Sequence, residues 1–227
     1  MKILIASDIH GSLKYCKELV ERYKEENCDK LILLGDVLYH GPRNDLPEEY
    51  NPKGVIALLN GMEDEILCVR GNCEAEVDDM VLSFPVLAEY AILYHKERLF
   101  FLTHGHKLNP DNLPKLKKGD VLFNGHTHVS KIEELENGIL YVNPGSVSIP
   151  KENTPRGYII VDDNESVVLN ANSSSNGTAH SISISGNDAI VNTRDYEYHM
   201  LQTNYNNTRY ELITKDNGSQ YLYQEGN

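Results

Sequence analysis

Residues 2–13, KILIASDIHGSL, contain the pattern that decides the fold of the first part of the chain. The short apolar run Lys2–Ala6 is typical of a buried strand, and the polar residues Asp8 and His10 follow where that strand should end. The next stretch, Ser12–Glu26, places its apolar residues on one helical face, and its first residue is a suitable N-cap. A strand followed by a helix predicts the start of a β-α-β unit with a parallel sheet at its core.

The same strand pattern returns through the first 164 residues. A second helix is predicted over Pro52–Asn60, because proline suits a first helical turn. Short apolar runs bounded by Gly, Asp or Asn predict further strands at Leu31–Leu34, Ile66–Val69, Leu99–Leu102 and Val121–Phe123. From Val86 onward the helical spacing fades, and turn-linked strands are expected at Ala88–Leu93, Arg98–Thr103, Val129–Leu135, Ile139–Val142 and Tyr158–Val161. We therefore expect two sheets packed face to face with helices on the outside.

Composition excludes some classes of protein. The 227 residues carry a formal net charge of −13, which argues against a non-specific binder of nucleic acid or anionic membranes, because such a protein needs a basic face. No apolar run approaches the roughly 20 residues of a membrane span, and the N-terminus has no signal-peptide pattern. The four cysteines form no CxxC pair, which is typical of reduced thiols. We expect a cytoplasmic protein.

Residues 165–227 differ from the domain expected at 1–164. They are rich in Asn, Ser, Thr and Tyr, and turn signals such as Gly186-Asn187 and Asn217-Gly218 separate alternating runs such as Tyr196–Leu201 and Tyr210–Thr214. This pattern predicts a polar, β-rich C-terminal extension packed on or extending the main domain. A disordered tail is the alternative.

Polar side chains follow five of the predicted strands, at the point where each strand ends. They comprise two carboxylates, one amide and four imidazoles, namely Asp8, His10, Asp36, Asn72, His104, His126 and His128. Loops at the carboxyl ends of strands in α/β sheets are where sites form, so we expect these donors to meet at one edge. Seven donors are too many for one divalent ion and favour two ions, with one carboxylate between them.

Other residues near these loops are candidates for supporting roles. His40 and Arg43 lie in the loop after Asp36, where they could bind a phosphate, and local loop structure is the alternative. His106 could donate to the ligands from beside His104. A turn at Asn143–Ser148 is expected to pack beneath the metal loops. The remaining histidines, His95, His180 and His199, are interpreted as surface residues.

The motifs that carry these donors resemble those of the calcineurin-like metallophosphoesterases. They are Asp8-Ile9-His10, Gly35-Asp36, Gly71-Asn72-Cys73-Glu74, His104-Gly105-His106 and Gly125-His126-Thr127-His128. Within that superfamily, three further stretches are similar to the small bacterial YfcE-type phosphodiesterases, namely Ser7–Leu13, His40–Asn44 and Asn143–Pro150. The resemblance covers roughly residues 1–164 and does not reach the Asn-rich tail.

The resemblance implies an α/β fold arranged as a four-layer αββα sandwich, with two mixed sheets flanked by helices, and a dinuclear metal site. Matched motif by motif, Asp8, His10 and His128 would hold one ion, Asp36 would bridge, and Asn72, His104 and His126 would hold the other. Manganese is the cofactor that such enzymes most often use. The donor set itself also allows Zn, Fe, Ni or Co.

One position departs from the wider superfamily. Its motif places a histidine directly after the Asn ligand, and that histidine commonly protonates the leaving group. Here the position is Cys73, as in the YfcE-type branch. The sequence leaves two roles open for this thiol, which could act as the general acid or could only pack.

The function expected on these grounds is metal-dependent hydrolysis of a small phosphodiester by a hydroxide that bridges the two ions. Two divalent ions and two carboxylates leave the site locally positive, so an anionic substrate is attracted despite the acidic chain. Nucleic acid and membrane are not expected as partners, and a homodimer or homotetramer remains open. The alternatives are a phosphomonoesterase and a protein-binding scaffold like the retromer-type relatives of this fold, whose metal sites are damaged.

Overall fold

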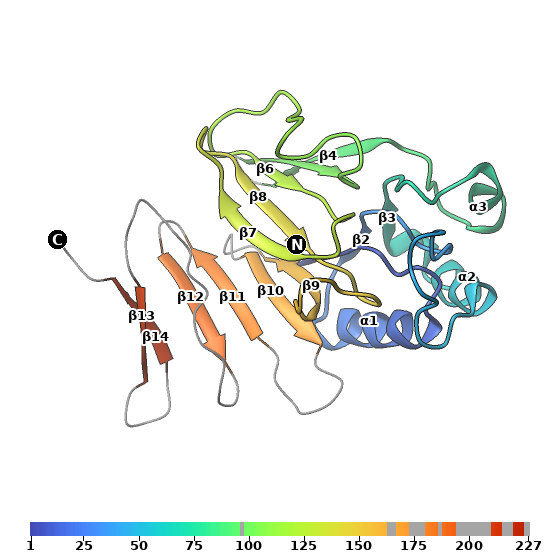
Figure 1. The fold of residues 1–227 in the computed structure, drawn as a ribbon, viewed down its shortest axis with the longest axis horizontal. Helices are drawn as coiled ribbons and strands as arrows, with labels where there is room; N and C mark the ends of the chain where they lie inside the picture. Colours follow the sequence, from blue (N-terminus) through green and yellow to red (C-terminus); the bar gives the residue numbers. More distant parts are fainter. Residues whose placement is uncertain are drawn as a thin grey trace.

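The computed structural model describes residues 1–95, 98–162, 167–172, 180–185, 188–193, 210–214 and 220–224, the last five segments as backbone only. Its main body contains two five-stranded sheets that lie against each other (Figure 1). Each sheet mixes parallel and antiparallel pairs, as expected for the α/β fold.

The first sheet has the strand order β10-β9-β1-β2-β3. Its strands are β1 (Ile3–Ala6), β2 (Lys30–Leu33), β3 (Ile66–Cys68), β9 (Arg156–Val161) and β10 (Val167–Asn172). β1, β2 and β3 are parallel, whereas β9 runs antiparallel to both β1 and β10. The parallel core confirms the β-α-β start predicted from the sequence.

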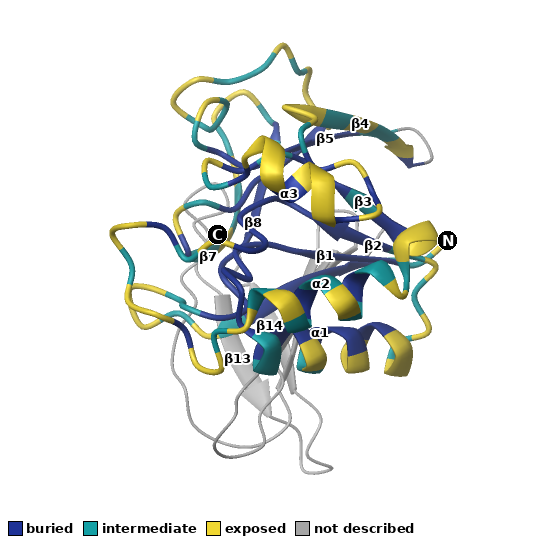
Figure 2. Cartoon of the chain, turned by 90° about the vertical axis from the view of Figure 1, so that its right-hand side faces the viewer, coloured by how far each residue is buried: buried dark blue, intermediate teal, exposed yellow. Residues whose placement is uncertain are grey.

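Two helices supply the crossovers between the parallel strands and cover the outer face of this sheet, with their buried sides turned toward it (Figure 2). α1 (Leu13–Glu25) begins where the Ser12 side chain accepts a hydrogen bond from the Tyr15 N–H, so the predicted N-cap is confirmed. α2 (Pro52–Asn60) has the predicted bounds, and its N-cap is Asn51.

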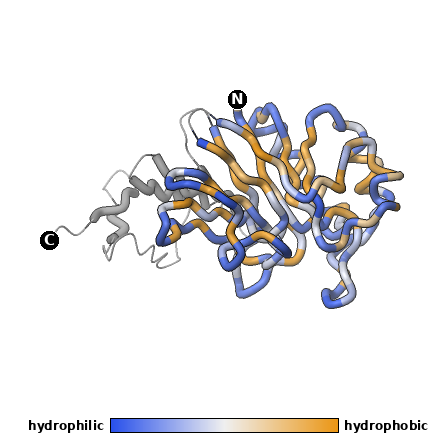
Figure 3. Tube along the Cα trace, turned by 90° about the horizontal axis from the view of Figure 1, so that it is seen from above, coloured by the Kyte–Doolittle hydropathy of each residue, from blue (hydrophilic) through white to orange (hydrophobic). Residues whose placement is uncertain are grey.

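The second sheet has the strand order β4-β5-β6-β8-β7. Its strands are β4 (Tyr90–His95), β5 (Arg98–Thr103), β6 (Val121–Phe123), β7 (Ser130–Glu134) and β8 (Leu140–Pro144). The apolar residues lie mainly along the strands (Figure 3), and a buried core joins the inner faces of the two sheets through residues such as Ile5, Ile32, Leu102 and Phe123. Two sheets packed face to face are therefore confirmed.

The outer face of the second sheet carries a loop and not the expected helical layer. Phe101 and Leu122 pack there against Leu108, Leu113 and Leu116 from the connection between β5 and β6. No helix occurs between residues 98 and 162. The connection contains two prolines, which interrupt a helix, while its leucines still cover the sheet.

Two further short elements were not predicted. The 3₁₀-helix η1 (Glu63–Glu65) precedes β3, and α3 (Glu76–Val81) follows it. Each is too short to produce a helical period in the sequence.

His95 is buried, at 6% exposure, so its interpretation as a surface residue is wrong. It ends β4, which begins and ends two residues later than predicted, and its ring stacks on Phe100 with a centroid distance of 5.7 Å. The side chain of His180 and the whole of His199 lie outside the described residues.

The C-terminal part is described only in pieces. β11 (His180–Ser185) pairs with β12 (Asp188–Thr193), and β13 (Tyr210–Thr214) pairs with β14 (Gln220–Gln224), both antiparallel. The predicted turns and the run Tyr196–Leu201 lie outside the described residues, so the role of the extension stays a prediction. No helix in the described segments is long and apolar enough to cross a membrane.

Candidate metal centre

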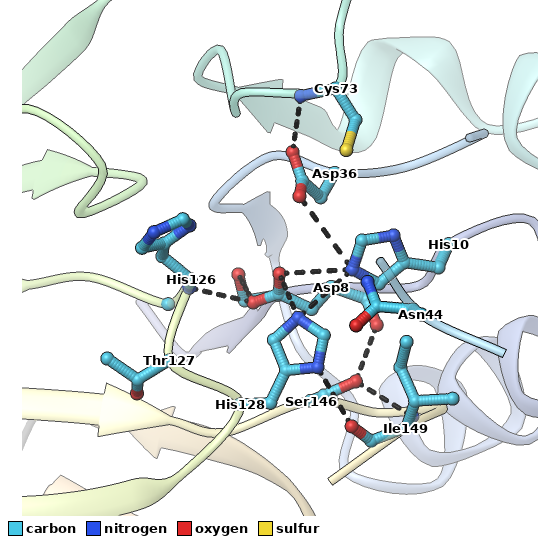
Figure 4. A network of polar contacts seen from close by, with 12 residues as sticks. Asp8, His10, Asp36, Asn44, Cys73, His126, Thr127, His128, Ser146 and Ile149 are labelled. Carbon is cyan, nitrogen blue, oxygen red and sulfur yellow. Dashed lines mark hydrogen bonds and ion pairs between the residues drawn. The ribbon is translucent and has the colours of Figure 1, made fainter. Parts of the chain in front are cut away.

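The predicted donors meet at one end of the two sheets. Three of the loops that carry them leave β1, β2 and β3 of the first sheet, and the other two leave β5 and β6 of the second. A close view shows side chains from both sheets gathered around Asp8 (Figure 4). The sequence argument that strand ends would bring these donors together therefore holds.

The backbone at the centre is strained. Five donors have a positive φ, namely Asp8 at 59°, His10 at 51°, Asp36 at 55°, His126 at 66° and His128 at 61°. Residues with a side chain rarely adopt this conformation, which costs about 1–3 kcal/mol each when the surrounding structure enforces it. Such strain concentrated on one group of side chains is typical of a functional site.

A first cluster consists of Asp8, His10 and His128, all buried. Oδ1 of Asp8 lies 3.4 Å from Nε2 of His10 and 3.2 Å from Nε2 of His128. Each ring contacts a backbone carbonyl through Nδ1, His10 at Tyr39 (2.7 Å) and His128 at Ile149 (2.8 Å). Because a carbonyl only accepts, Nδ1 carries the proton, and a neutral ring directs the lone pair of Nε2 at Asp8.

Asp8 Oδ1 is buried and has no hydrogen-bond partner in the described structure. The other oxygen, Oδ2, accepts hydrogen bonds from Ser7 Oγ (2.6 Å) and from the backbone N–H of His126 (3.0 Å). A buried carboxylate oxygen without a donor, facing two imidazole lone pairs, fits a cation. These residues could therefore hold a divalent ion.

The turn at Asn143–Ser148 supports the first cluster from below, as predicted. The hydroxyls of Ser146 and Ser148 both donate to the backbone carbonyl of Asp8, at 2.7 and 2.9 Å. All three residues are buried. The turn thus fixes the strained backbone at Asp8 without supplying a ligand.

Asp36 lies between the first cluster and a second group of donors. Its Oδ2 is 3.7 Å from Nε2 of His10 and 3.5 Å from Nε2 of His104. Its Oδ1 accepts the backbone N–H of Cys73 at 2.9 Å. One carboxylate oxygen therefore faces both groups, which is the placement that a bridging ligand needs.

The second cluster consists of His104, Asn72 and His126. Nε2 of His104 is 3.1 Å from Oδ1 of Asn72 and 3.2 Å from Nδ1 of His126, and its Nδ1 donates to the carbonyl of Leu34 at 2.7 Å. His104 is buried, His126 is half-buried and Asn72 is exposed. This cluster is thus the side of the centre that is open to solvent.

The ionisation of the carboxylates suits cation binding. Burial would raise the pKa of Asp8, but its close contacts with His10 and His128 and the charge of His104 hold it well below its usual value. Burial would also raise the pKa of Asp36, but contact with His104 lowers it below its usual value. Burial by itself would lower the pKa of His104, but the nearby Asp36 and Asp8 raise it to about 9. The centre therefore carries two carboxylates that stay ionised at neutral pH.

Cys73 lies at the centre, as its motif predicted. Its sulfur, a ring nitrogen of His10 and a carboxylate oxygen of Asp36 lie within 4.8 Å of one another. Burial, and then the negative charge of Asp36, raise the pKa of this thiol. The raised pKa keeps the thiol protonated at neutral pH but also makes it a weaker acid, so both predicted roles, proton donation and packing, stay predictions.

His40 and Arg43 occupy different environments within one loop. The His40 ring is packed edge-on between Tyr39 and Tyr50, with centroid distances of 4.8 and 5.2 Å, whereas Arg43 is exposed. The backbone carbonyl of His40 accepts a hydrogen bond from the side chain of Asn44 at 2.8 Å. The packing of His40 favours a role in the structure of the loop, and contact of either residue with substrate stays a prediction.

His106 flanks the second cluster. Its ring centroid lies 5.4 Å from that of His104 and 6.2 Å from that of His126. Its Nδ1 is buried without a hydrogen-bond partner in the described structure. Burial, and then the charge of His104, lower its pKa to about 4. His106 is therefore a neutral neighbour of the second cluster at neutral pH.

Glu74 is a residue of the centre that the sequence reasoning missed. It is 4% exposed, and its carboxylate accepts backbone N–H groups from Asp36, Val37 and Gly71. The motif Gly71-Asn72-Cys73-Glu74 contains it, but only the folded chain brings the loop of Asp36 to this carboxylate.

Comparison with known proteins agrees with this architecture. The family described as the calcineurin-like phosphoesterase superfamily domain matches residues 1–166. Phosphodiesterase YfcE of Escherichia coli is 47% identical over 176 residues, which cover 77% of this chain and 95% of the relative. A solved structure of YfcE, described as a phosphoesterase from E. coli, superimposes with a TM-score of 0.71 at 45% identity, over 75% of this chain and 92% of the other. A phosphodiesterase of Methanocaldococcus jannaschii is 26% identical over 153 residues, 64% of this chain and 83% of the relative.

Proposed function

The chain belongs to the calcineurin-like phosphoesterase superfamily as a YfcE-like member, and from that premise we propose that it is a phosphodiesterase that works with two divalent ions. The observation that carries the proposal is the position of Asp36, whose Oδ2 faces His10 at 3.7 Å and His104 at 3.5 Å. A carboxylate between two groups of nitrogen and oxygen donors is the arrangement of a two-ion site.

The residues divide between the two ions as follows. Asp8, His10 and His128 would hold one ion and Asn72, His104 and His126 would hold the other, with Asp36 shared between them. We propose manganese as the ion, and the same donors accept Zn, Fe, Ni or Co. When bound, the ions supply Lewis-acid activation of the phosphate and of the attacking water.

The chain's own groups prepare the site for this chemistry. The backbone carbonyls of Tyr39, Leu34 and Ile149 hold the rings of three histidine ligands in one tautomer and orientation. Cys73 is the proposed donor of a proton to the leaving oxygen, because its sulfur lies among the ligands beside His10 and Asp36.

The substrate class follows from charge and from the relatives. The nearby cation on the loop after Asp36 is the exposed Arg43, which suits the single negative charge of a diester better than the double charge of a monoester. The relative from E. coli is named a phosphodiesterase. A phosphomonoesterase remains the second enzymatic candidate, and a scaffold is disfavoured because all seven donor positions are filled.

A test compares substrates and metals on the same preparation. The metal-free chain is loaded in turn with Mn²⁺, Zn²⁺, Ni²⁺, Co²⁺ and Mg²⁺, its metal content is measured, and hydrolysis of bis(p-nitrophenyl) phosphate and p-nitrophenyl phosphate is followed. We expect two ions per chain and a higher kcat/KM for the diester. Uptake of metal without hydrolysis of either ester would favour the scaffold, and a faster monoester would favour the phosphomonoesterase.

A further inference from the structure

Glu74 is a buried carboxylate that joins two loops of the metal centre. One loop follows β2 and carries Asp36, and the other follows β3 and carries Asn72. Oε2 of Glu74 accepts the backbone N–H of Asp36 at 2.9 Å and also that of Gly71, while Oε1 accepts the N–H of Val37 at 2.7 Å. One side chain thus satisfies three backbone donors from two loops.

The two loops also touch through their backbones. A Cβ on Gly71 would lie 2.1 Å from Oδ1 of Asp36 and 2.7 Å from Oε2 of Glu74, and a Cβ on Gly35 would lie 2.4 Å from the backbone nitrogen of Gly71. Oδ1 of Asp36 in turn accepts the N–H of Cys73. The junction has no spare space, so close packing and the hydrogen bonds of Glu74 together fix the two loops relative to each other.

Glu74 itself has no place in the donor clusters. Its oxygens are occupied by N–H groups, and none of the His, Cys, Asp and Glu groups that could hold an ion in the described structure includes it. The three backbone N–H groups compensate for the burial of this carboxylate at the junction. Its contribution must come through the backbone groups that it holds.

The first cluster is held by other contacts. His10 and His128 are fixed by the carbonyls of Tyr39 and Ile149, and Asp8 is fixed by Ser7 from the side and by the turn at Asn143–Ser148 from below. Glu74 makes none of these bonds. A change at Glu74 should therefore act on the second cluster through both Asp36 and Asn72, and on the first cluster less, because it reaches that cluster only through Asp36.

We propose that Glu74 is a positioning residue that sets the spacing between Asp36 and Asn72 and thereby the affinity of the centre for its second ion. The inference rests on the proposed two-ion phosphodiesterase. Loss of a residue that hydrogen-bonds to a metal ligand and orients it typically lowers metal affinity about 10- to 100-fold. Glu74 differs from such residues because it acts on the backbone of the loops and not on a ligand side chain.

The test uses Glu74→Gln, whose amide places one NH₂ group against a backbone N–H and so breaks at least one of the three bonds. Asp78→Asn is the matched control, because Asp78 is also a buried carboxylate, at 9% exposure, and accepts the Ala75 N–H at 2.7 Å at the start of α3. The metal-free full-length proteins are titrated with Mn²⁺ by calorimetry, which resolves two binding steps. Diester hydrolysis is then measured against Mn²⁺ concentration.

For Glu74→Gln we expect the weaker Mn²⁺ step to lose about 10- to 100-fold in affinity, with the tighter step changed less than about threefold. Activity should return at high Mn²⁺ with kcat near that of wild type and with the KM for the diester unchanged. Asp78→Asn should leave both binding steps as in wild type. The recovery by metal is a result that general damage to the fold would not give.

Unchanged binding in Glu74→Gln, or an equal loss at both steps, would overturn the inference. If the Gln variant does not fold, Glu74→Asp is measured by the same criteria, since it keeps the charge but is one methylene shorter. Failure of both variants to fold would also overturn the inference, because Glu74 would then determine stability and not the second ion. A wild-type protein that binds fewer than two ions or hydrolyses no diester would instead contradict the proposed function.

Discussion

The two donor clusters of the centre are built from similar residues but sit in different surroundings. In the first, Asp8, His10 and His128 are all buried, and every ring is locked by a backbone carbonyl. In the second, His104 is buried, whereas His126 is half-buried and Asn72 is exposed. An ion held by the first cluster would thus be enclosed by the protein, while an ion held by the second would share its surroundings with solvent.

This difference suggests a division of labour. The enclosed cluster, with an ionised carboxylate that lacks a donor, should bind its ion more tightly and exchange it more slowly. The open cluster should bind its ion more weakly and present it to the substrate. Asp36 faces both clusters. The proposed difference between the clusters can therefore be tested by substituting Asp36 first, then a ligand of each cluster, and then residues near them.

The largest effect is expected for Asp36→Asn, which removes the negative charge that the two proposed ions would share. Hydrolysis should fall by several orders of magnitude, while the circular dichroism spectrum of the metal-free protein stays close to that of wild type. Turnover within tenfold of wild type would show that no bridging carboxylate is needed.

Next come paired changes in the two clusters. Asn72→Ala should remove or weaken only the looser Mn²⁺ step, whereas His10→Ala should abolish the tighter one and greatly lower total metal content. Calorimetry and metal analysis of the two variants side by side measure this. If Asn72→Ala and His10→Ala affect the same binding step, the assignment of the two clusters to separate ions is wrong.

A selective effect is expected for Cys73→Ser. If the thiol protonates the leaving oxygen, the variant should hydrolyse alkyl diesters about 10²- to 10⁴-fold more slowly and nearly spare p-nitrophenyl esters, whose leaving group needs no proton. Equal losses on both substrates would show that Cys73 only packs against the loop that contains Gly41. A Cβ added to Gly41 would lie 3.4 Å from the sulfur of Cys73.

The stability of the metal-free protein should depend on pH in a defined direction. The folded pKa of His104 is raised to about 9, so its favourable contribution is complete below pH 6.5 and disappears as the pH rises through 9. The melting temperature of the metal-free protein should therefore fall over this range. Mn²⁺ should reverse the trend, because its binding requires deprotonated histidines. Parallel pH profiles with and without metal would contradict this account.

The smallest effect on chemistry is expected from the tail. A chain that ends at Asn172 keeps β10, which pairs along β9, and lacks none of the seven donors. It should bind both ions and hydrolyse diesters within a few-fold of the full chain, with a change in apparent size or solubility. Retained metal binding with no hydrolysis would place substrate-handling groups in the tail.

The sequence predicted the parts of the centre that depend on local pattern. Each donor follows a short apolar run, and the carboxyl ends of such strands lie at one end of the fold, so Asp8, Asp36 and His104 could be grouped before the structure was known. The cap of α1 at Ser12 was also local, because the hydroxyl and its N–H partner are three residues apart.

The features that were missed depend on contacts between distant parts of the chain. Glu74 accepts hydrogen bonds from residues 37 and 38 positions away, and His95 is buried because its strand packs near Asp162. The loop over the second sheet contains apolar residues without a helical period, so it could not be recognised as a layer. In each case the burial or hydrogen bonding of the residue is determined by a contact with a distant part of the chain, which the local sequence does not show.

The central claim is that two ions lie on either side of Asp36. Crystals of the Mn²⁺-loaded chain, measured at the manganese absorption edge, test it directly through the anomalous difference map. We predict two peaks, one enclosed by Asp8, His10 and His128 and the other among Asn72, His104 and His126, with the Asp36 carboxylate between them. A single peak at full Mn²⁺ loading, or two peaks that Asp36 does not touch, would contradict the account.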